Sequence, residues 1–464
     1  MTVERRNEAV RAAVEQGLLT EEQPVAALLD VAGIRASAAS LRAAFAAVTD
    51  APVLHAFAVK AAPLVPVLAL LNAEGIGAEV ASPGELALAR AAGIAPGRTV
   101  LDSPAKTPGE LREALALGIA VNADNPQELA RLDALVSASH TGAAGATDST
   151  GATGATDSNG SNGAPRTGSP LGLRVNPQIG GGSIGALSTA TATSKFGVAL
   201  RDEGAREAVV RMYLDRPWLT RLHTHSGSQG IALTRMMEGV REVYALAEEI
   251  NAAAGRQQID TVDIGGGLPV NFSSDEEIPT FAAYAALLKE RVPGLLDGRY
   301  GLVTEFGRAL LAKNGLILAR VEYTKVSGSR PIAVTHAGVQ VATRTVYDPV
   351  SWPLRIAAYD SAGVPRKGAP VAQDIAGPAC FAGDLLAEAR ELPPLEPGDV
   401  VAVLDTGAYY FSNHYGYNSL PRPGVYGYTG GDGGEGVRFA PVRAPQSVTE
   451  IVTESGGENR DALV

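Results

Sequence analysis

The feature that most constrains the fold is a repeated alternation of short apolar runs with longer amphipathic segments rich in Ala and Leu. Apolar runs of strand length that alternate with segments of helical length predict parallel strands joined by crossover helices. The expected strands are residues 53–59, 77–81, 99–102, 120–122, 171–175, 222–225, 261–264 and 302–305. The expected helices between the first of them are residues 63–75, 82–93, 108–117 and 126–136. This number of units favours a closed (β/α)8 barrel, with an open doubly wound sheet as the alternative.

The pattern changes along the chain and predicts a division into four segments. Residues 1–50, with a strand near 26–30, are expected to contribute to a second domain and to pack on the barrel of residues 51–314. Residues 315–445 contain short strands separated by Gly, Pro and Asp with little helical periodicity, which predicts an antiparallel β domain. Residues 446–464 are expected to form a loose tail.

The barrel pattern is interrupted by residues 137–170, which consist mainly of Gly, Ala, Thr, Ser, Asn and Asp. Such a segment has too little apolar surface to offset the entropy of ordering. We expect a flexible insertion without chemistry of its own, and a functional lid is the alternative.

Charge and cysteine content exclude several classes of protein. The formal charge of -11 argues against nucleic acid or an anionic membrane as a partner. The single cysteine, Cys380, excludes an internal disulfide framework and a Cys-rich zinc site. The N-terminus lacks the apolar core of a signal peptide, and no apolar stretch is long enough to span a membrane. A soluble, cytoplasmic protein without a metal is expected.

Lys60 ends the apolar run 53–59. A buried ammonium is costly inside a barrel, but at the carboxyl end of a strand it faces the mouth where barrel enzymes hold their active sites. Desolvation there lowers the pKa of the amine, which suits Schiff-base chemistry. The alternative is a strand-end lysine that reaches water.

Three further motifs follow expected strands. Residues 265–267 are three glycines, whose backbone N–H groups can approach an anion, although an ordinary turn has the same composition. Glu305 and Arg308 end another strand and could meet a cofactor or form a surface ion pair. His223 and His225 end a third expected strand and are followed by Gly-Ser. Two histidines in this pattern indicate a functional site more than a packed core, but the sequence lacks other convincing zinc ligands nearby.

These motifs, with Cys380 and Tyr417 downstream, occur in an order that resembles the group IV (fold-type III) pyridoxal-phosphate-dependent decarboxylases, such as diaminopimelate and ornithine decarboxylases. The resemblance extends from about residue 28 to about residue 428, apart from the insertion. Its motifs are Val-Lys-Ala, Gly-Ala-Glu-Val-Ala-Ser-Pro-Gly-Glu-Leu, Ser-Lys-Phe-Gly, His-x-His-x-Gly-Ser-Gln, Gly-Gly-Gly, Glu-x-Gly-Arg, Cys-x-x-Gly-Asp and Gly-Ala-Tyr…Tyr-Asn…Arg-Pro. It implies an alanine-racemase-like barrel with a C-terminal antiparallel β domain, and pyridoxal 5'-phosphate as cofactor.

The resemblance also implies roles for single residues. Lys60 would bind the cofactor covalently, His225 would stack on its pyridine ring and Glu305 would pair with the ring nitrogen. Cys380 would donate a proton in the partner subunit's site, which implies a head-to-tail homodimer with shared sites. The phosphate and the substrate carboxylate would be surrounded by Ser228, Gly265, Gly266, Gly267, Arg308 and Tyr417.

Two other functions are compatible with such a barrel. An amino-acid racemase of this fold resembles a pattern with arginine at the ring nitrogen, so Glu305 favours decarboxylation, because a carboxylate stabilises the protonated ring that serves as electron sink. A catalytically silent cofactor-binding protein would need neither Lys60 nor the proton donor Cys380.

The sequence departs from the family at the distal end of the substrate. Phe381 stands where these decarboxylases carry an acidic residue, and Trp352 and Ile356 align with the arginine and tyrosine of Arg-Pro-Ala-Leu-Tyr, which take the distal carboxylate of diaminopimelate. A pocket of Phe, Trp and Ile could not pair a distal charge. We therefore expect a substrate with an apolar or atypical side chain, and the alternative is a diaminopimelate decarboxylase proper.

Overall fold

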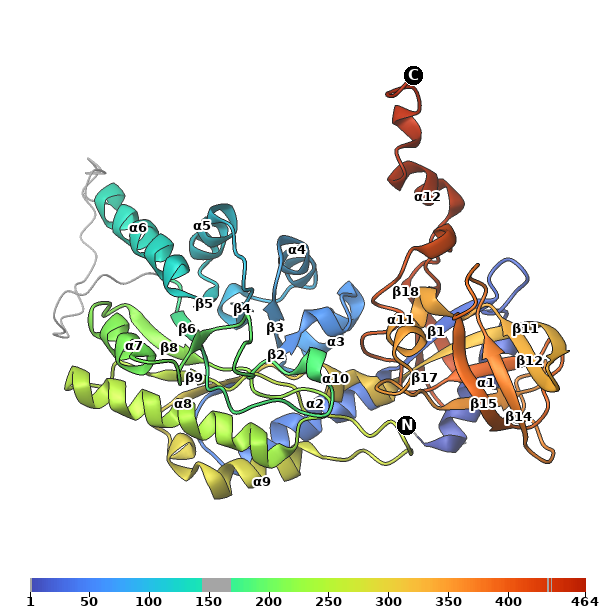
Figure 1. The fold of residues 1–464 in the computed structure, drawn as a ribbon, viewed down its shortest axis with the longest axis horizontal. Helices are drawn as coiled ribbons and strands as arrows, with labels where there is room; N and C mark the ends of the chain where they lie inside the picture. Colours follow the sequence, from blue (N-terminus) through green and yellow to red (C-terminus); the bar gives the residue numbers. More distant parts are fainter. Residues whose placement is uncertain (1, 144–167, 432–433, 435) are drawn as a thin grey trace.

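The computed structural model describes residues 2–143, 168–431, 434 and 436–464. Most of the expected insertion 137–170 therefore lies outside the described residues. The described chain forms a barrel surrounded by helices and a second unit dominated by β strands, which lie side by side in Figure 1.

Eight parallel strands close into a barrel, as the alternation in the sequence predicts, and the open sheet is excluded. β2 pairs with β3 on one side and with β10 on the other, and the parallel pairing of β5 with β6 completes the ring. The strands are β2 (Val53–Ala58), β3 (Gly77–Val80), β4 (Thr99–Leu101), β5 (Ala120–Ala123), β6 (Leu171–Asn176), β8 (Leu219–His223), β9 (Thr261–Asp263) and β10 (Gly301–Thr304). A short strand, β7 (Val198–Ala199), pairs with β6 outside the ring.

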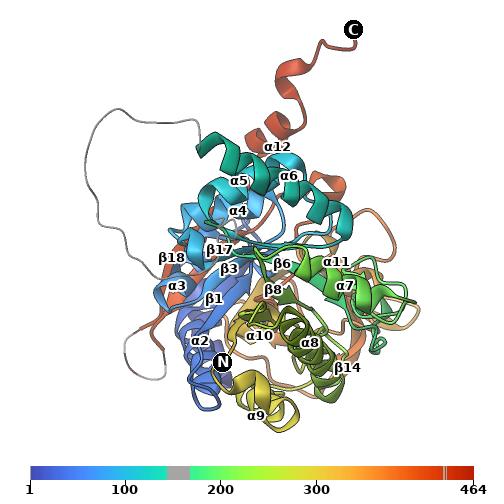
Figure 2. The ribbon, with the colours of Figure 1, turned by 90° about the vertical axis from the view of Figure 1, so that its left-hand side faces the viewer.

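Helices cover the outside of the barrel, as Figure 2 shows in a view along it. They are α2 (Val31–Ala46), α3 (Val65–Ala73), α4 (Pro83–Ala91), α5 (Pro108–Leu117), α6 (Pro126–Ala143), α7 (Ala205–Leu214), α8 (Leu233–Ala254), α9 (Phe281–Arg291) and the short α10 (Arg308–Leu311). Local sequence sets where they begin: Ser82 caps α4 by accepting the N–H of Glu85, and Pro83 occupies the first turn, where its missing N–H costs nothing.

The second unit is built on a nine-stranded sheet that combines a strand from the N-terminal segment with strands from the C-terminal part of the chain. Its order is β15-β14-β12-β11-β1-β17-β18, and β16 pairs with both β11 and β13. The strand β1 (Val25–Asp30), from the N-terminal segment, lies between β11 and β17. The other strands are β11 (Gly315–Ser327), β12 (Arg330–Thr335), β13 (Ile356–Tyr359), β14 (Val371–Ala376), β15 (Leu385–Leu392), β16 (Val400–Val403), β17 (Gly424–Thr429) and β18 (Arg438–Arg443).

Most pairings in this sheet are antiparallel, but β1 with β17 and β12 with β14 are parallel. Three of its strands (β14, β15 and β18) and the helix α11 (Val339–Tyr347) were not anticipated from the sequence. The helices α1 (Val3–Glu15) and α12 (Val448–Glu454) lie near the two termini, and α12 makes part of the expected loose tail helical.

The mouth of the barrel contacts a loop of the second unit. The N–H of Tyr409 and the hydroxyl of Ser412 both bond to the carbonyl of Ala61, directly after Lys60 (2.9 and 3.0 Å). The carboxyl ends of the barrel strands therefore open toward the second sheet. Among the described residues, no helix combines the length and apolar character that crossing a membrane requires.

Candidate active site

Lys60 directly follows β2, and its ammonium bonds to Glu79 of the neighbouring strand β3 (Nζ–Oε2 2.5 Å). The Glu79 side chain is 1% exposed, whereas that of Lys60 is 42% exposed toward the mouth. Burial alone would lower the pKa of Lys60, but the charge and hydrogen bond of Glu79, together with the charges of Tyr409 and Glu305, outweigh it and raise the pKa. The expected lowering of this pKa is therefore wrong for the cofactor-free chain, because the contact between Glu79 and Lys60 arises only when β2 and β3 pair.

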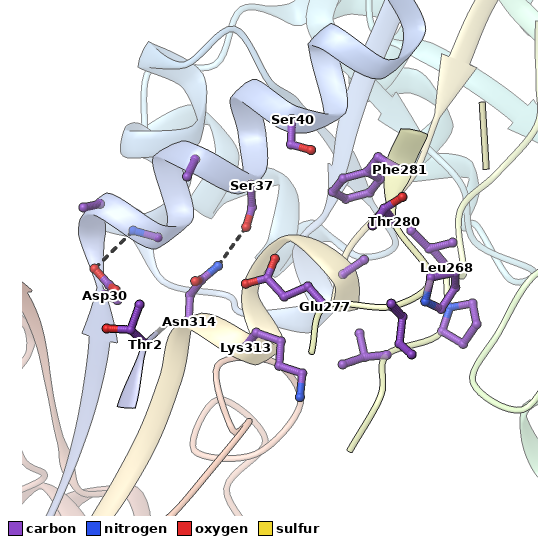
Figure 3. A pocket seen from close by; sticks show the side chains of 18 of the residues that line it. Thr2, Asp30, Ser37, Ser40, Leu268, Glu277, Thr280, Phe281, Lys313 and Asn314 are labelled. Carbon is purple, nitrogen blue, oxygen red and sulfur yellow. Dashed lines mark hydrogen bonds between the residues drawn. The ribbon is translucent and has the colours of Figure 1, made fainter. Parts of the chain in front are cut away.

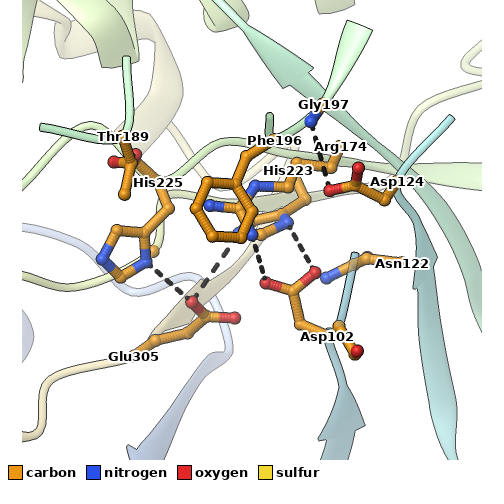
Figure 4. Close-up of polar contacts among 12 residues, drawn as sticks. Asp102, Asn122, Asp124, Arg174, Thr189, Phe196, Gly197, His223, His225 and Glu305 are labelled. Atoms are coloured by element: carbon orange, nitrogen blue, oxygen red, sulfur yellow. Dashed lines mark hydrogen bonds and ion pairs between the residues drawn. The ribbon is translucent and has the colours of Figure 1, made fainter. Parts of the chain in front are cut away.

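Glu305 follows β10 at the centre of the mouth and is 1% exposed. Its Oε2 lies 3.1 Å from Nδ1 of His225, which follows β8 (Figure 4). Burial would raise the pKa of Glu305, but His223 and then His225 bring it well below its usual value. The structure thus brings together the two side chains that were expected at the cofactor ring, with the carboxylate in its ionised form.

The glycines lie in two loops that pack directly on one another. A Cβ on Gly266 would collide with the carbonyl of Glu305, and one on Gly267 would collide with the backbone of Gly227 and Ser228. Gly265 has a φ of +66°, a conformation that favours glycine. The N–H of Gly265 donates to Asp263 (3.1 Å) and that of Gly266 to Nδ1 of His225 (3.4 Å), so these loops hold the neighbouring site residues. A glycine-rich turn at the mouth is suited to the close approach of an anion such as phosphate.

Arg308 begins α10 and is almost fully buried (8% exposed). Its guanidinium lies over the rings of Trp352 (4.8 Å) and Tyr409 (4.5 Å). The guanidinium of Arg344 lies over the same two rings, at 5.1 and 4.8 Å. Burial, with a smaller contribution from Arg344, lowers the pKa of Arg308 to about 10.

The buried Nη1 atoms of Arg308 and Arg344 have no hydrogen-bond partner among the described residues. Two adjacent cations with free donors form a site for an anionic group. Sequence reasoning missed Arg344 because it aligned the family's Arg-Pro-Ala-Leu-Tyr with 352–356. The available signal was an earlier Arg and Tyr: Arg344, which lies eight residues before Trp352, and Tyr347.

The residues expected at the distal pocket are not together. Trp352 is buried under the two guanidinium groups, whereas Ile356 lies in β13, paired with Val403 in the sheet. Phe381 belongs to an exposed aromatic cluster in which it stacks on Tyr347 (5.9 Å) and meets Tyr417 edge-on (5.5 Å). A continuous apolar wall of Phe, Trp and Ile does not form.

Cys380 is exposed and lies beside this cluster, where its N–H bonds to Oδ1 of Asn418 (2.7 Å). Within the part of the chain that the structure describes, no hydrogen bond, ion pair or ring contact joins Cys380 or Tyr417 to Lys60. One chain therefore presents two groups of expected site residues, one in the barrel mouth and one on the surface.

A cavity of about 460 Å³ between α2, α9 and the start of β11 is separate from these residues (Figure 3). Its polar groups already bond to one another: Asn314 donates to Ser37 (3.0 Å), and the N–H of Gly33 donates to Asp30 (3.1 Å). It offers no chemistry of its own.

The residues of the mouth fit pyridoxal phosphate. Glu305 retains one buried oxygen, Oε1, without a hydrogen-bond partner, although the rest of the carboxylate is paired. Lys60 supplies an amine and His225 an aromatic ring. The glycine loops supply backbone N–H groups, and they pack so closely that a Cβ at these positions would collide with neighbouring backbone. An amine, an acid and an anion cradle are what this cofactor requires of a protein.

Comparison with known proteins points to the same chemistry. The chain is 32% identical to the diaminopimelate decarboxylase of Pseudomonas aeruginosa, over 83% of this chain and 85% of that protein. It is 28% identical to the diaminopimelate decarboxylase of Zymomonas mobilis, over 86% and 85%. The structure of a diaminopimelate decarboxylase from Helicobacter pylori complexed with L-lysine superposes with a TM-score of 0.77 at 22% identity, covering 96% of this chain and all of that one.

These relatives overturn the expectation of an apolar or atypical substrate. Relatives that match over most of the chain are diaminopimelate decarboxylases, so the alternative reading is the better supported one. The physical reason lies in the misplaced alignment: Trp352 supports two cations instead of lining an apolar pocket.

Residues 31–312 match the family model described as "Pyridoxal-dependent decarboxylase, pyridoxal binding domain". This match covers more than half of the chain, includes Lys60, His225, Glu305 and Arg308, and spans the whole barrel. The chain therefore belongs to the pyridoxal-phosphate-dependent decarboxylases of fold type III.

Proposed function

We propose that this protein decarboxylates meso-diaminopimelate to lysine, as the names of its relatives suggest. The observation that carries the proposal is the pair of guanidinium groups of the buried Arg308 and the partly buried Arg344, whose buried Nη1 atoms are unpaired among the described residues. Diaminopimelate ends in a second amino-acid group whose carboxylate such a pair can bind by charge-assisted hydrogen bonds. Ornithine and lysine end in an ammonium alone, which two cations would repel, and an apolar side chain would leave both donors unpaired.

In this proposal Lys60 binds the cofactor, and Glu79 accepts and returns the proton of the Lys60 ammonium. The ammonium of Lys60 must lose a proton before the amine can react. Burial raises the pKa of Glu79 against the opposing effect of the Lys60 ammonium, so this carboxylate is a stronger base than an ordinary glutamate. At 2.5 Å from Nζ, the Glu79 carboxylate is placed to receive that proton and to return it.

The remaining residues of the mouth bind and orient. His225 would cover one face of the cofactor ring, Glu305 would pair with its nitrogen, and Ser228 with the loop 265–267 would bind the phosphate. When bound, the cofactor supplies an electron sink for the charge that departing carbon dioxide leaves behind. Because Glu305 is ionised and buried, it stabilises the protonated ring nitrogen on which this sink depends.

We infer a homodimer in which each site uses residues of both subunits. Cys380, Phe381 and Tyr417 lie on the surface with an aromatic cluster that includes Tyr347 (59% exposed). In the proposed dimer this surface closes the mouth of the partner, and Cys380 donates the proton that replaces carbon dioxide. An exposed cysteine with this role must remain a thiol, which suits the reducing cytoplasm.

The test measures carbon dioxide released from meso-diaminopimelate, L-lysine, L-ornithine and L-leucine by the holoenzyme. We expect release from meso-diaminopimelate alone. Arg344→Met removes one charged partner of the distal carboxylate and should raise KM roughly 10- to 100-fold, the effect of losing a charge-assisted hydrogen bond.

Arg299→Met is the matched control, because Arg299 forms a surface ion pair with Asp297 and precedes β10 at the opposite end of the barrel. It should leave KM unchanged. Faster release of carbon dioxide from ornithine or leucine than from meso-diaminopimelate would contradict the proposed substrate.

A further inference from the structure

His223 is the last residue of β8, and its ring lies inside the barrel with 0% of the side chain exposed. Two carboxylates flank it, as Figure 4 shows. Nδ1 lies 3.4 Å from Oδ1 of Asp102, which follows β4, and Nε2 lies 3.6 Å from Oε2 of Glu305. The family resemblance assigned this histidine no role.

The arrangement requires a particular protonation state. A neutral imidazole carries one N–H and presents a lone pair at the other nitrogen, so one of the two carboxylates would face a lone pair. Neither ring nitrogen has a hydrogen-bond partner of ordinary geometry among the described residues, so the two carboxylates face the ring as neighbouring charges. Only the imidazolium presents an N–H and a positive charge to both carboxylates in an interior where unpaired charge is costly.

The surrounding charges favour that cation. Burial alone would lower the pKa of His223, but Asp102, then Glu305 and Asp263, raise it to about 10. Arg174 pairs with the other oxygen of Asp102, Oδ2 (3.1 Å), which leaves Oδ1 facing His223, and Lys60 pairs with Glu79. Arg221, at 4% exposed, lies beneath on the same strand and faces Asp263 and Asp260.

The charge of His223 acts on Glu305. Its Oε2 is shared between Nε2 of His223 and Nδ1 of His225, whereas its Oε1 is buried and has no hydrogen-bond partner. Two histidines therefore fix one oxygen and leave the other for the cofactor ring.

We propose that His223 is a positioning residue, anchored as a cation by Asp102, that keeps Glu305 ionised and oriented so that Oε1 is free for the ring nitrogen of the cofactor. This inference rests on the assignment of the cofactor and is independent of the substrate.

The first test uses the cofactor-free chain and NMR of histidine side chains labelled with ¹⁵N. The chain has six histidines, and the signal missing in His223→Gln identifies the one of interest. We expect imidazolium shifts for His223 at pH 8, and a titration midpoint that moves to lower pH in Asp102→Asn, which removes one of the two carboxylates. A neutral ring at pH 7 in the wild type would overturn the proposal.

The second test is a double-mutant cycle in the holoenzyme. His223→Gln should lower kcat roughly 10- to 100-fold, the usual effect of losing a group that orients a functional ligand, with KM little changed. In a Glu305→Gln background the same change should have almost no further effect on kcat, because His223 acts through the Glu305 carboxylate, which this background lacks.

His55→Gln is the matched control. His55 is also buried in the barrel (6% exposed), and its ring bonds to Thr304, the residue before Glu305 (2.8 Å). It should affect stability but combine additively with Glu305→Gln. If His223→Gln were equally additive, His223 would be structural only. Failure to release carbon dioxide from meso-diaminopimelate would refute the proposed substrate and leave the NMR result unaffected.

Discussion

The buried acids of the barrel mouth are each held by a base. Glu79 bonds to Lys60, Asp102 pairs with Arg174, and Glu305 contacts His225. An isolated ion in such an interior would cost several kcal/mol, so removing one partner strands the other. The same arrangement that makes these groups useful to a cofactor makes the cofactor-free site sensitive to single substitutions.

The tightest steric constraint in the site falls on Gly266. A Cβ there would collide with the backbone of Glu305 and Phe306, and backbone cannot move aside as a flexible side chain can. Gly266→Ala should therefore displace Glu305 and weaken binding of pyridoxal phosphate at least tenfold, a cost of about 1.4 kcal/mol. Titration of the cofactor by absorbance measures this.

Gly185→Ala is the control for this substitution, because nothing lies within 4 Å of its Cβ position. It should bind the cofactor like the wild type. Equal affinity in Gly266→Ala would show that the loops are less closely packed than described.

The elements of the barrel are held together by buried polar contacts as well as by apolar packing. β2 and β10 pair in parallel, and the ring of His55 on β2 bonds to Thr304 on β10 while its edge meets Phe45 of α2. This contact connects two strands and a helix at one point.

His55 predicts acid sensitivity. Burial, with help from Arg42, lowers the pKa of His55 to about 4. The unfolded chain therefore binds a proton that the folded chain does not, so stability falls as the pH drops from the unfolded pKa of about 6.5 toward 4. Between pH 7 and pH 5 this amounts to about 2 kcal/mol.

Chemical denaturation of the cofactor-free protein at the two pH values tests this point. His55→Asn should lose about 2 kcal/mol less than the wild type over this interval, because asparagine does not titrate. The same loss in both proteins would contradict the prediction.

Local capping fixes the start of α5. Thr107 accepts the N–H of Glu110, and the Glu110 carboxylate accepts the N–H of Thr107, a complete capping box at an exposed helix end. Thr107→Ala should lower the free energy of unfolding by about 1 kcal/mol, whereas Thr107→Ser, which keeps the hydroxyl, should be near neutral. Thermal denaturation of both variants measures the difference, and an alanine variant as stable as wild type would contradict it.

The whole molecule places its proposed site residues on two faces. Lys60 lies in the barrel mouth, whereas Cys380 is exposed beside the aromatic cluster of Tyr347, Phe381 and Tyr417. A single chain in solution would leave the aromatic cluster in water, which the proposed twofold dimer avoids.

Subunit mixing tests the shared sites. Lys60→Ala and Cys380→Ala homodimers should each be inactive, but a heterodimer contains one intact site. Random exchange of equal amounts should restore about a quarter of wild-type activity, since half of the dimers are mixed and each has one working site of two. Analytical ultracentrifugation of each variant checks that dimers are present, and no recovery in mixed dimers would show that each site belongs to one chain.

The sequence by itself determined the barrel and its principal residues. Strand and helix lengths are local properties, so the expected strands agree with β2 to β6 and β8 to β10 within a few residues, and helix α5 begins and ends where it was expected. Lys60 and Glu305 could be placed at the mouth because each lies at the carboxyl end of an apolar strand, and Arg308 because it begins the helix after one. The β domain was less predictable, because β15 and β18 carry several charged residues and read as strands only through their pairing with β14 and β17.

Only the tertiary structure decided which charges meet. Glu79 and Lys60 lie on neighbouring strands, Asp102 and His223 come from opposite parts of the barrel, and Arg344 reaches Arg308 from another unit of the fold. None of these pairs has a fixed spacing along the chain, and both the pKa values and the anion site depend on distances of a few ångströms. Local sequence specifies each element, but electrostatic partnership arises only when the elements pack.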